Sequence, residues 1–282
     1  KNFNNYRRIT ERALKMGLTR KDAIIAIGGG VVGDIAGFVA STYMRGIDYI
    51  QVPTTLLACV DSSVGGKVAI DTKYGKNLIG CFYQPKAVFI NLNFLKTLDD
   101  RQYKTGLGEV VKYVFIEKSC KCSEELNLAN FITENADKIT AGNLNTLEYL
   151  VEYCIKLKKS VVEQDEKEHG LRKILNFGHT YAHAVENITK YKKYTHGEAV
   201  VKGIYFAFEL AEKRGLTDKN YKFFANDILS KFNFKHVYNL PQDKVLKVMK
   251  MDKKADFNKI NFILPVDYFT VEEYALSEDE IF

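Results

Sequence analysis

The chain has 282 residues, of which 46% are hydrophobic and 27% are charged, an ordinary balance for a globular protein of two domains or one large one. Its net charge of +6 is spread along the chain without a basic block, and no apolar run reaches the roughly 18 residues of a membrane helix, so the sequence argues against binding to nucleic acid or crossing a membrane. The cysteines are odd in number and lack a CxxC pair, so we expect reduced cytosolic thiols at Cys59, Cys81, Cys120, Cys122 and Cys154.

Residues 1–98 are predicted to form an α/β domain. The apolar run 23–27 ends in three glycines, which is typical of a buried parallel strand that enters a tight turn. Helical spacing follows over residues 31–44, and further strand-like runs cover 49–52 and 87–90. Strands that alternate with helices indicate an α/β layer.

Residues 99–282 are predicted to form a second, mostly α-helical domain. One strand is expected at 259–264, and Gly215 suits the position just after a helix end. The segments with helical spacing are 106–116, 123–135, 146–164, 177–187 and 197–214. The domain boundary is therefore expected near residue 99.

The segment 28–33 reads GGGVVG and fits the pattern G-x-G-x-x-G between a strand and a helix. Such glycines let the backbone approach a pyrophosphate at a helix N-terminus, where N–H groups and the helix dipole favour an anion. The acidic residue that should bind a ribose at the end of the second strand is missing, because Asp48 lies before that strand. The loop therefore indicates a nucleotide site of a non-standard kind, with a purely structural glycine turn as the alternative.

A second glycine segment, 63–68, reads SVGGKV and resembles a phosphate-binding P-loop. Asp61 stands where a P-loop has its first glycine, and Val68 replaces the Ser or Thr that would hold magnesium. The segment is therefore not a P-loop. Lys67 nevertheless lies beside flexible glycines, where a cation can reach a phosphate.

Four side chains have the types that bind zinc, and three ligands are expected among them. His179 and His183 are four residues apart on one predicted helix face, His196 begins the next helix, and Glu109 begins an otherwise apolar helix. A shell of two histidines and one carboxylate leaves a coordination position open, as catalytic zinc requires. Structural histidines are the alternative, and the spacing leaves open whether His183 is a ligand or supports one.

Together these segments resemble the 3-dehydroquinate synthase family, in order and over nearly the whole chain. The matching stretches are GGGVVGD (28–34), YMRG (43–46), PTTLLA (53–58), DSSVGGK (61–67), GKN (75–77), GLGEVVKY (106–113), DE (165–166), GLR (170–172), NFGHTYAHAVE (176–186), HGE (196–198) and DKK (252–254). Ala182 and Val114 stand where the family usually has glycine. The family also has a preceding segment that helps to bind the adenosine end of NAD, so we expect that this chain lacks the extreme N-terminus.

The resemblance implies a role for each matching residue. Zinc, or cobalt as a substitute, would be held by Glu109, His179 and His196. The NAD site would be lined by Gly30, Val31, Val32, Gly33, Asp34, Thr54, Thr55, Lys67, Lys76, Phe94, Leu95, Lys96 and Thr97. The substrate would be surrounded by Asp61, Lys67, Asn77, Lys112, Lys158, Arg172, Asn176 and His183, with one of Lys253 and Lys254. Arg45 would reach into the site of a partner subunit, so a homodimer is implied.

The resemblance also implies the reaction. The family's substrate is DAHP, a seven-carbon keto sugar acid phosphate, which is oxidised by NAD⁺, loses phosphate, is reduced again and closes by an aldol step to 3-dehydroquinate. This lyase reaction belongs to the shikimate pathway of aromatic amino acid biosynthesis, which is expected in the cytoplasm. The alternatives are another sugar phosphate cyclase, a metal-dependent polyol dehydrogenase, and a module that binds ligand without turnover.

Overall fold

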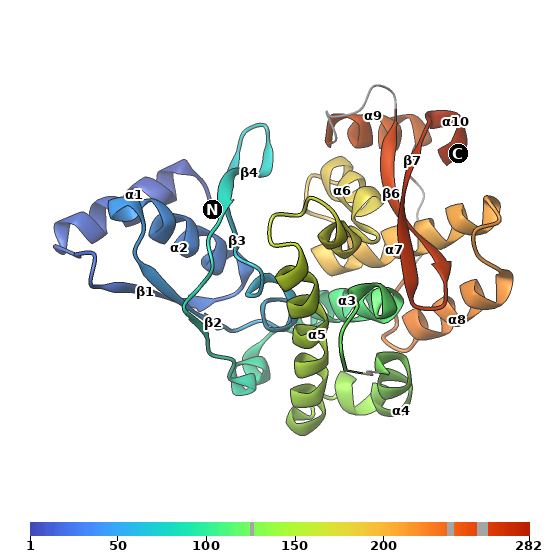
Figure 1. The fold of residues 1–282 in the computed structure, drawn as a ribbon, viewed down its shortest axis with the longest axis horizontal. Helices are drawn as coiled ribbons and strands as arrows, with labels where there is room; N and C mark the ends of the chain where they lie inside the picture. Colours follow the sequence, from blue (N-terminus) through green and yellow to red (C-terminus); the bar gives the residue numbers. More distant parts are fainter. Residues whose placement is uncertain (125–126, 236–239, 253–258) are drawn as a thin grey trace. The chain divides into compact units, whose positions relative to one another are not determined.

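The computed structural model describes residues 1–124, 127–235, 240–252 and 259–282. The chain separates into two compact units, Lys1–Asp99 and Asp100–Phe282 (Figure 1). The prediction that Lys253 or Lys254 contacts the substrate falls outside the described residues. No helix in the described part of the chain is long and apolar enough to cross a membrane.

The first unit is an α/β unit, as the sequence predicted. Its parallel sheet has the strand order β1-β2-β5. The strands are β1 (Ala23–Gly28), β2 (Asp48–Pro53) and the short β5 (Ala87–Val88). The expectation that β1 is buried was wrong, because only Ala26 in it is buried. Helices α1 (Phe3–Lys15) and α2 (Gly30–Thr42) contact each other, and α2 packs against β1 and β2. Helix α1 was not predicted, because most of its residues are polar and only Ala13 is buried.

The first unit also contains an antiparallel hairpin that the sequence did not predict. Strand β3 (Lys67–Thr72) pairs with β4 (Gly75–Phe82). Most of β4 is exposed to solvent, so its residues do not alternate between apolar and polar types as a half-buried strand would. Three short helical turns complete the unit, namely η1 (Tyr43–Arg45), η2 (Ala58–Ser62) and η3 (Leu92–Thr97).

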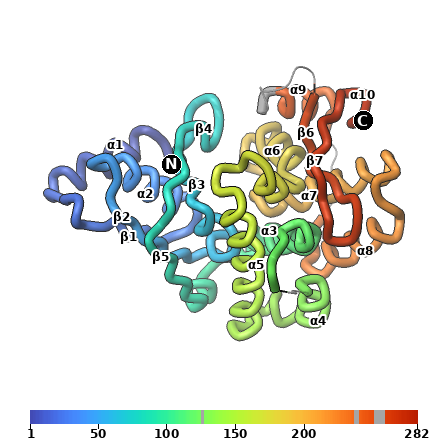
Figure 2. Tube along the Cα trace, viewed as in Figure 1, coloured from blue at the N-terminus to red at the C-terminus, as the bar shows by residue number. Residues whose placement is uncertain are grey.

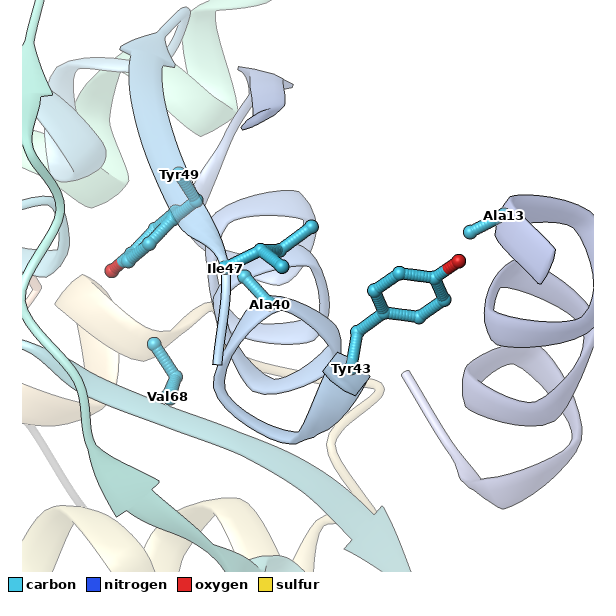
Figure 3. Packing of buried hydrophobic residues seen from close by; sticks show 6 residues of the cluster. All are labelled: Ala13, Ala40, Tyr43, Ile47, Tyr49 and Val68. Atoms are coloured by element: carbon cyan, nitrogen blue, oxygen red, sulfur yellow. The ribbon is translucent and has the colours of Figure 1, made fainter. Parts of the chain in front are cut away.

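A cluster of buried side chains holds α1, α2, β2 and β3 together. Figure 3 shows its members Ala13, Ala40, Tyr43, Ile47, Tyr49 and Val68. The hydroxyls of two buried tyrosines find acceptors, because Tyr43 donates to the carbonyl oxygen of Leu18 at 2.9 Å and Tyr49 to that of Tyr83 at 3.0 Å. The glycine-rich helix α2 is therefore anchored on two sides, which fixes the loop at its N-terminus.

The second unit is mainly helical, as predicted. Its helices are α3 (Asp100–Ile116), α4 (Leu128–Thr140), α5 (Leu144–Gln164), α6 (His179–Ile188), α7 (His196–Lys213), α8 (Lys219–Ser230), α9 (Gln242–Asp252) and α10 (Glu278–Ile281), with turns η4 (Lys118–Cys120) and η5 (Leu171–Asn176). Helix α3 begins six residues before the predicted start. Helix α4 begins five residues after its predicted start, because Asn127 caps it by accepting from the backbone N–H of Asn130 at 3.0 Å.

The expectation of one strand in this unit was wrong. Strand β6 (Ile260–Asp267) pairs in antiparallel fashion with β7 (Thr270–Leu276), and the two strands run side by side in Figure 2. Strand β6 packs on α7. The sequence of β7, TVEEYAL, shows no regular alternation, so its pairing with β6, and not its own pattern, makes it a strand.

Glu117 is a buried carboxyl group between α3 and α4, and we predict that its ionisation weakens the fold. Both of its carboxylate oxygens accept from the backbone N–H of Leu128, at 3.3 and 3.2 Å. Burial nevertheless raises the pKa of Glu117 to about 7, above its ordinary value of 4.5. The folded state therefore holds this proton more tightly than the unfolded state, and stability is lost as the pH rises through the interval from about 4.5 to 7.

Glu117→Gln should therefore raise the free energy of unfolding at pH 8 by about 1–3 kcal/mol, because glutamine keeps an acceptor but cannot ionise. At pH 5 the difference from the wild type should shrink. Urea denaturation of both proteins at pH 5 and pH 8 measures this difference in the free energy of unfolding. Glu163→Gln, which changes an exposed carboxylate on α5, is the control and should show no such pH dependence. An equal effect of Glu117→Gln at pH 5 and pH 8 would contradict the prediction.

Candidate active site

Glu109 lies in the middle of α3, so the prediction that it begins a helix was wrong. Its side chain is completely buried. Helices α3 and α7 approach so closely here that a Cβ on Gly108 would lie 2.5 Å from the Cα of Gly197, and one on Gly197 would overlap the carbonyl oxygen of Thr105. Two glycines therefore allow the close helix contact that brings Glu109 to the first turn of α7.

His179 is the first residue of α6, and Gly178 directly before it adopts φ +76°. A Cβ on Gly203 in α7 would overlap the carbonyl oxygen of Gly178, so a second glycine pair fixes the start of α6 against α7. The imidazole Nδ1 of His179 lies 3.0 Å from the carbonyl oxygen of Phe177. Since a carbonyl oxygen can only accept, Nδ1 carries the proton and Nε2 has the free lone pair.

His196 is the first residue of α7, and a capping box fixes its backbone. The backbone N–H of Thr195 donates to the carboxylate of Glu198 at 2.7 Å, and the backbone N–H of Glu198 donates to the hydroxyl of Thr195 at 3.4 Å. Arg101 of α3 reaches the same turn, because its Nη2 donates to the carbonyl oxygen of Lys193 at 2.6 Å and lies 3.3 Å from Glu198.

These elements bring Glu109, His179 and His196 together, so that one ligand atom from each lies within 4.8 Å of the others. The Nε2 atoms of His179 and His196 lie 3.4 and 3.1 Å from the same carboxylate oxygen, Oε1 of Glu109. The other oxygen, Oε2, lies 2.5 Å from the Nζ of Lys112. Two imidazole nitrogens and one carboxylate oxygen form a common donor set for catalytic zinc.

Two of the three groups in this cluster have protonation states that fit a divalent metal ion. Burial opposes ionisation of Glu109, but Lys112 and His179 hold its pKa well below the usual range. Burial lowers the pKa of His179. Burial also disfavours the charged form of His196, but Glu109 and Glu186 outweigh it and raise the pKa of His196 to about 10. Glu109 and His179 are therefore already in the forms that bind a metal.

His183 lies one turn after His179 on α6 and is exposed. The ring centroids of the two histidines are 5.7 Å apart. Among the described residues, the group whose ligand atoms converge contains Glu109, His179 and His196. This arrangement favours a role for His183 beside the metal ligands over a role as a fourth ligand.

Four other predicted substrate residues lie in the second unit. Lys112 and Arg172 are each 1% exposed, and Lys158 of α5 is also buried. Helix α5 contacts η5, the turn that begins after Gly170 and ends at Asn176. The side chain of Asn176 donates to Oε1 of Glu168 at 2.6 Å.

Asp165 organises the loop that presents Arg172. Its carboxylate accepts from the backbone N–H groups of His169, Gly170 and Arg172 at 3.0, 2.7 and 3.0 Å. The bonds from Arg172 and then from Gly170 and His169 lower the pKa of Asp165 to about 2. The guanidinium of Arg172 donates to the carbonyl oxygen of Glu166, so this side chain also supports its own loop.

The predicted NAD loop lies at the carboxyl ends of β1 and β2. The backbone N–H of Thr54 donates to the carbonyl oxygen of Gly28 at 3.0 Å. A Cβ on Gly29 would lie 2.9 Å from the side chain of Thr55. One on Gly30 would lie 2.8 Å from Ser62, and one on Gly33 would lie 2.5 Å from Gln51. These glycines are therefore needed for packing, whether or not a pyrophosphate approaches them. Val31 and Val32 in the first turn of α2 are exposed.

The β3–β4 hairpin separates two predicted phosphate contacts. Lys67 pairs with Phe82 at one end of the hairpin, whereas Lys76 and Asn77 follow the turn at the other end, roughly 16 Å away along β4. Asn77 adopts φ +57°, and its backbone N–H donates to Asp71 at 3.1 Å. The structure instead brings Asn77 close to Asp34, because the Nζ of Lys1 contacts both.

The remaining predicted residues of the first unit occupy short turns. Asp61 lies in η2, and Phe94, Leu95, Lys96 and Thr97 lie in η3. Leu95 is buried, so packing explains its presence at least as well as cofactor binding does. Arg45 is exposed at φ +69°, between Met44 at +49° and Gly46 at +119°. Three successive residues in the left-handed region are uncommon, and they turn the chain sharply at Arg45.

The sequence reasoning missed Glu186 as a site residue. It is buried on α6, and its Oε1 lies 3.5 Å from the Nδ1 of His196. Glu186 follows His179 by seven residues, or two helical turns, so it shares a helix face with that residue. This spacing is the signal that would have indicated it.

Residues 1–105 match the family model for the 3-dehydroquinate synthase N-terminal domain, and residues 106–255 match the model for the C-terminal domain. A 3-dehydroquinate synthase from Alkaliphilus metalliredigens (strain QYMF) is 45% identical over 282 residues, which cover 100% of this chain and 77% of the relative. A structure of 2-deoxy-scyllo-inosose synthase with carbaglucose-6-phosphate, NAD⁺ and Co²⁺ is 28% identical at a TM-score of 0.90, covering 100% of this chain and 78% of that one.

A probable glycerol dehydrogenase from Sinorhizobium meliloti 1021 shares the fold more distantly. It is 17% identical at a TM-score of 0.64, and the match covers 88% of this chain and 74% of that one. That protein therefore shares the fold of this chain, while the sequence identity to the synthase from Alkaliphilus metalliredigens is much higher.

Proposed function

The chain belongs to the 3-dehydroquinate synthase family, and from this premise we propose how its residues carry out the reaction. The protein is a 3-dehydroquinate synthase, which converts DAHP to 3-dehydroquinate and phosphate in the shikimate pathway with NAD and a divalent metal ion. The observation that carries the assignment of its site is the convergence of Glu109, His179 and His196.

The metal would be held by the carboxylate of Glu109 and by the Nε2 atoms of His179 and His196. When bound, it supplies a Lewis acid that lowers the pKa of a substrate hydroxyl and polarises a carbonyl group. The protein keeps the two rings in position through the carbonyl oxygen of Phe177 and through the capping box at the start of α7. Lys112 offsets the charge of the buried carboxylate when the metal is absent.

NAD would be bound by the first unit. When bound, it would supply a hydride acceptor that is regenerated within each turnover. The N-terminal end of α2 carries free N–H groups and a positive dipole end, which favour the pyrophosphate. The residues that we assign to this site are Gly30, Val31, Val32, Gly33, Asp34, Thr54, Thr55, Lys67, Lys76 and Phe94 to Thr97.

The substrate carries a phosphate and a carboxylate, and we assign separate groups to these two anions. Lys158 and Arg172 of the second unit suit the carboxylate, because both are cationic and α5 contacts the η5 turn that holds Arg172. Lys67 is assigned to the phosphate. Asn77, which lies at the other end of the β3–β4 hairpin, and His183 are assigned to other parts of the substrate. Asp61, Lys112 and Asn176 are assigned to the rest of the substrate.

We further propose a homodimer in the cytoplasm. The exposed Arg45, on its sharply turned segment, would complete the site of a partner subunit. All five cysteines are free thiols, and Cys59, Cys120 and Cys154 are buried. Free thiols are typical of a reducing compartment.

Turnover of DAHP tests the function. The protein with NAD⁺, Zn²⁺ and DAHP should release one phosphate for each DAHP consumed, without net formation of NADH, because the hydride returns to the product. Phosphate release and the absorbance of NADH measure the two quantities. NADH formed in proportion to substrate would instead indicate a polyol dehydrogenase. Phosphate release from a carboxylate-free sugar phosphate, but not from DAHP, would indicate another cyclase.

A further inference from the structure

Glu186 is a buried carboxylate beside the metal cluster that contributes no ligand to it. It lies on α6, its side chain is 6% exposed, and its Oε1 lies 3.5 Å from the Nδ1 of His196. On the opposite edge of the same ring, Nε2 lies 3.1 Å from Glu109. His196 is therefore held between two carboxylates, one at each ring nitrogen.

The two histidines of the cluster are oriented by different groups. The Nδ1 of His179 faces a neutral acceptor, the carbonyl oxygen of Phe177, whereas the Nδ1 of His196 faces the charged Glu186. A carboxylate that accepts from Nδ1–H fixes the tautomer, keeps the ring plane in place and makes the opposite nitrogen a stronger donor. We propose that Glu186 is a positioning residue that presents Nε2 of His196 to the metal and strengthens its bond.

The backbone of Glu186 has contacts of its own, which a change of the side chain leaves in place. The backbone carbonyl oxygen of Glu186 already accepts from the backbone N–H of Tyr191 at 2.8 Å and from the hydroxyl of Thr189 at 3.4 Å. These bonds end α6 and shape the loop that leads to His196, and they do not depend on the side chain. A substitution of the side chain therefore keeps the bonds that end the helix, and a readout at the metal reports on the contact with His196.

The proposal also explains why a carboxylate is buried at this position. A buried carboxylate is costly unless a group of opposite charge or a strong donor faces it. The imidazole of His196 supplies such a donor through Nδ1, and a metal ion on Nε2 makes that N–H more acidic and the contact stronger. The cost of burying Glu186 is therefore offset at the place where the metal binds.

Zinc affinity of the metal-free protein, measured by competition with a chromophoric chelator, tests the proposal. Glu186→Ala should weaken zinc binding by about 10- to 100-fold, the usual effect of removing the partner of a metal-binding histidine. Glu186→Gln keeps an acceptor but loses the charge, and should weaken binding by about three- to tenfold. The absorption spectrum of bound Co²⁺ should change in both variants, because it reports on the ligand field.

Glu117→Gln is the matched control, because Glu117 is also a buried carboxylate of this unit but faces the backbone N–H of Leu128. It should leave zinc affinity and the Co²⁺ spectrum unchanged. If Glu186→Ala fails to fold, Glu186→Gln decides alone. Wild-type zinc affinity and an unchanged Co²⁺ spectrum in the Gln variant would overturn the proposal. The proposal rests on the metal site assigned above, and a wild-type protein that binds no zinc would overturn both.

Discussion

His179→Ala should lower kcat/KM for DAHP by about a thousandfold or more and should prevent tight zinc binding. The variant removes one of three ligands and leaves a buried carboxylate and one imidazole, which cannot hold a catalytic zinc ion firmly. A bound metal contributes several kcal/mol to the stabilisation of transition-state charge. A loss of about 4 kcal/mol corresponds to roughly a thousandfold in rate.

Phosphate release with excess zinc and the zinc content after dialysis are the two measurements. His169→Ala is the control, because His169 is an exposed histidine of the same unit, and the substitution keeps the backbone N–H that donates to Asp165. It should keep both activity and zinc. A His179→Ala protein that retains one zinc ion and most of its activity would show that the metal is bound elsewhere.

Arg172→Lys should lower kcat/KM for DAHP by roughly 10- to 100-fold. A guanidinium can grip a carboxylate with two parallel hydrogen bonds, whereas an ammonium group cannot. The loss of a charged hydrogen bond costs on the order of 1.5–3 kcal/mol, which corresponds to this range of rates. Zinc affinity should barely change.

The competing explanation is that Arg172 only stabilises its loop through the carbonyl oxygen of Glu166. The inhibition constant of a carboxylate-free sugar phosphate separates the two roles. If Arg172 binds the substrate carboxylate, this constant should stay nearly unchanged in Arg172→Lys. An equal loss for DAHP and for the carboxylate-free ligand would make Arg172 a structural residue. Arg214→Lys, which alters an ion pair with Glu280 at 3.1 Å, is the control and should affect neither ligand.

The local sequence was enough to predict the parts of this protein that depend on neighbouring residues. Strands β1 and β2 are apolar runs, and the glycine loop between β1 and α2 has its own pattern. The start of α7 likewise depends on neighbouring residues, because Thr195 and Glu198 form a capping box within four residues. The ordered series of motifs identified the family, and the family models confirmed it.

Strands whose residues show no regular alternation could not be predicted from the sequence. Strand β4 is largely exposed and β7 has no alternation, so each exists because a partner strand supplies its hydrogen bonds. The residues of one strand do not determine by themselves which other segment will pair with it. The start of α4 differed from the prediction for a related reason, since the cap that begins this helix is a single side chain, Asn127, in a polar stretch.

The geometry of the metal site was decided by tertiary structure alone. Glu109 is 70 residues before His179 in the sequence, and residue types indicated both as ligands without giving their distance. Gly108 against Gly197 and Gly178 against Gly203 allow α3, α6 and α7 to approach until the ligand atoms lie within 4.8 Å. Glu186 lies beside His196 for the same reason, because α6 packs against α7. Spacing along one helix can place side chains on a common face, but the approach of separate helices depends on which small residues meet where they cross.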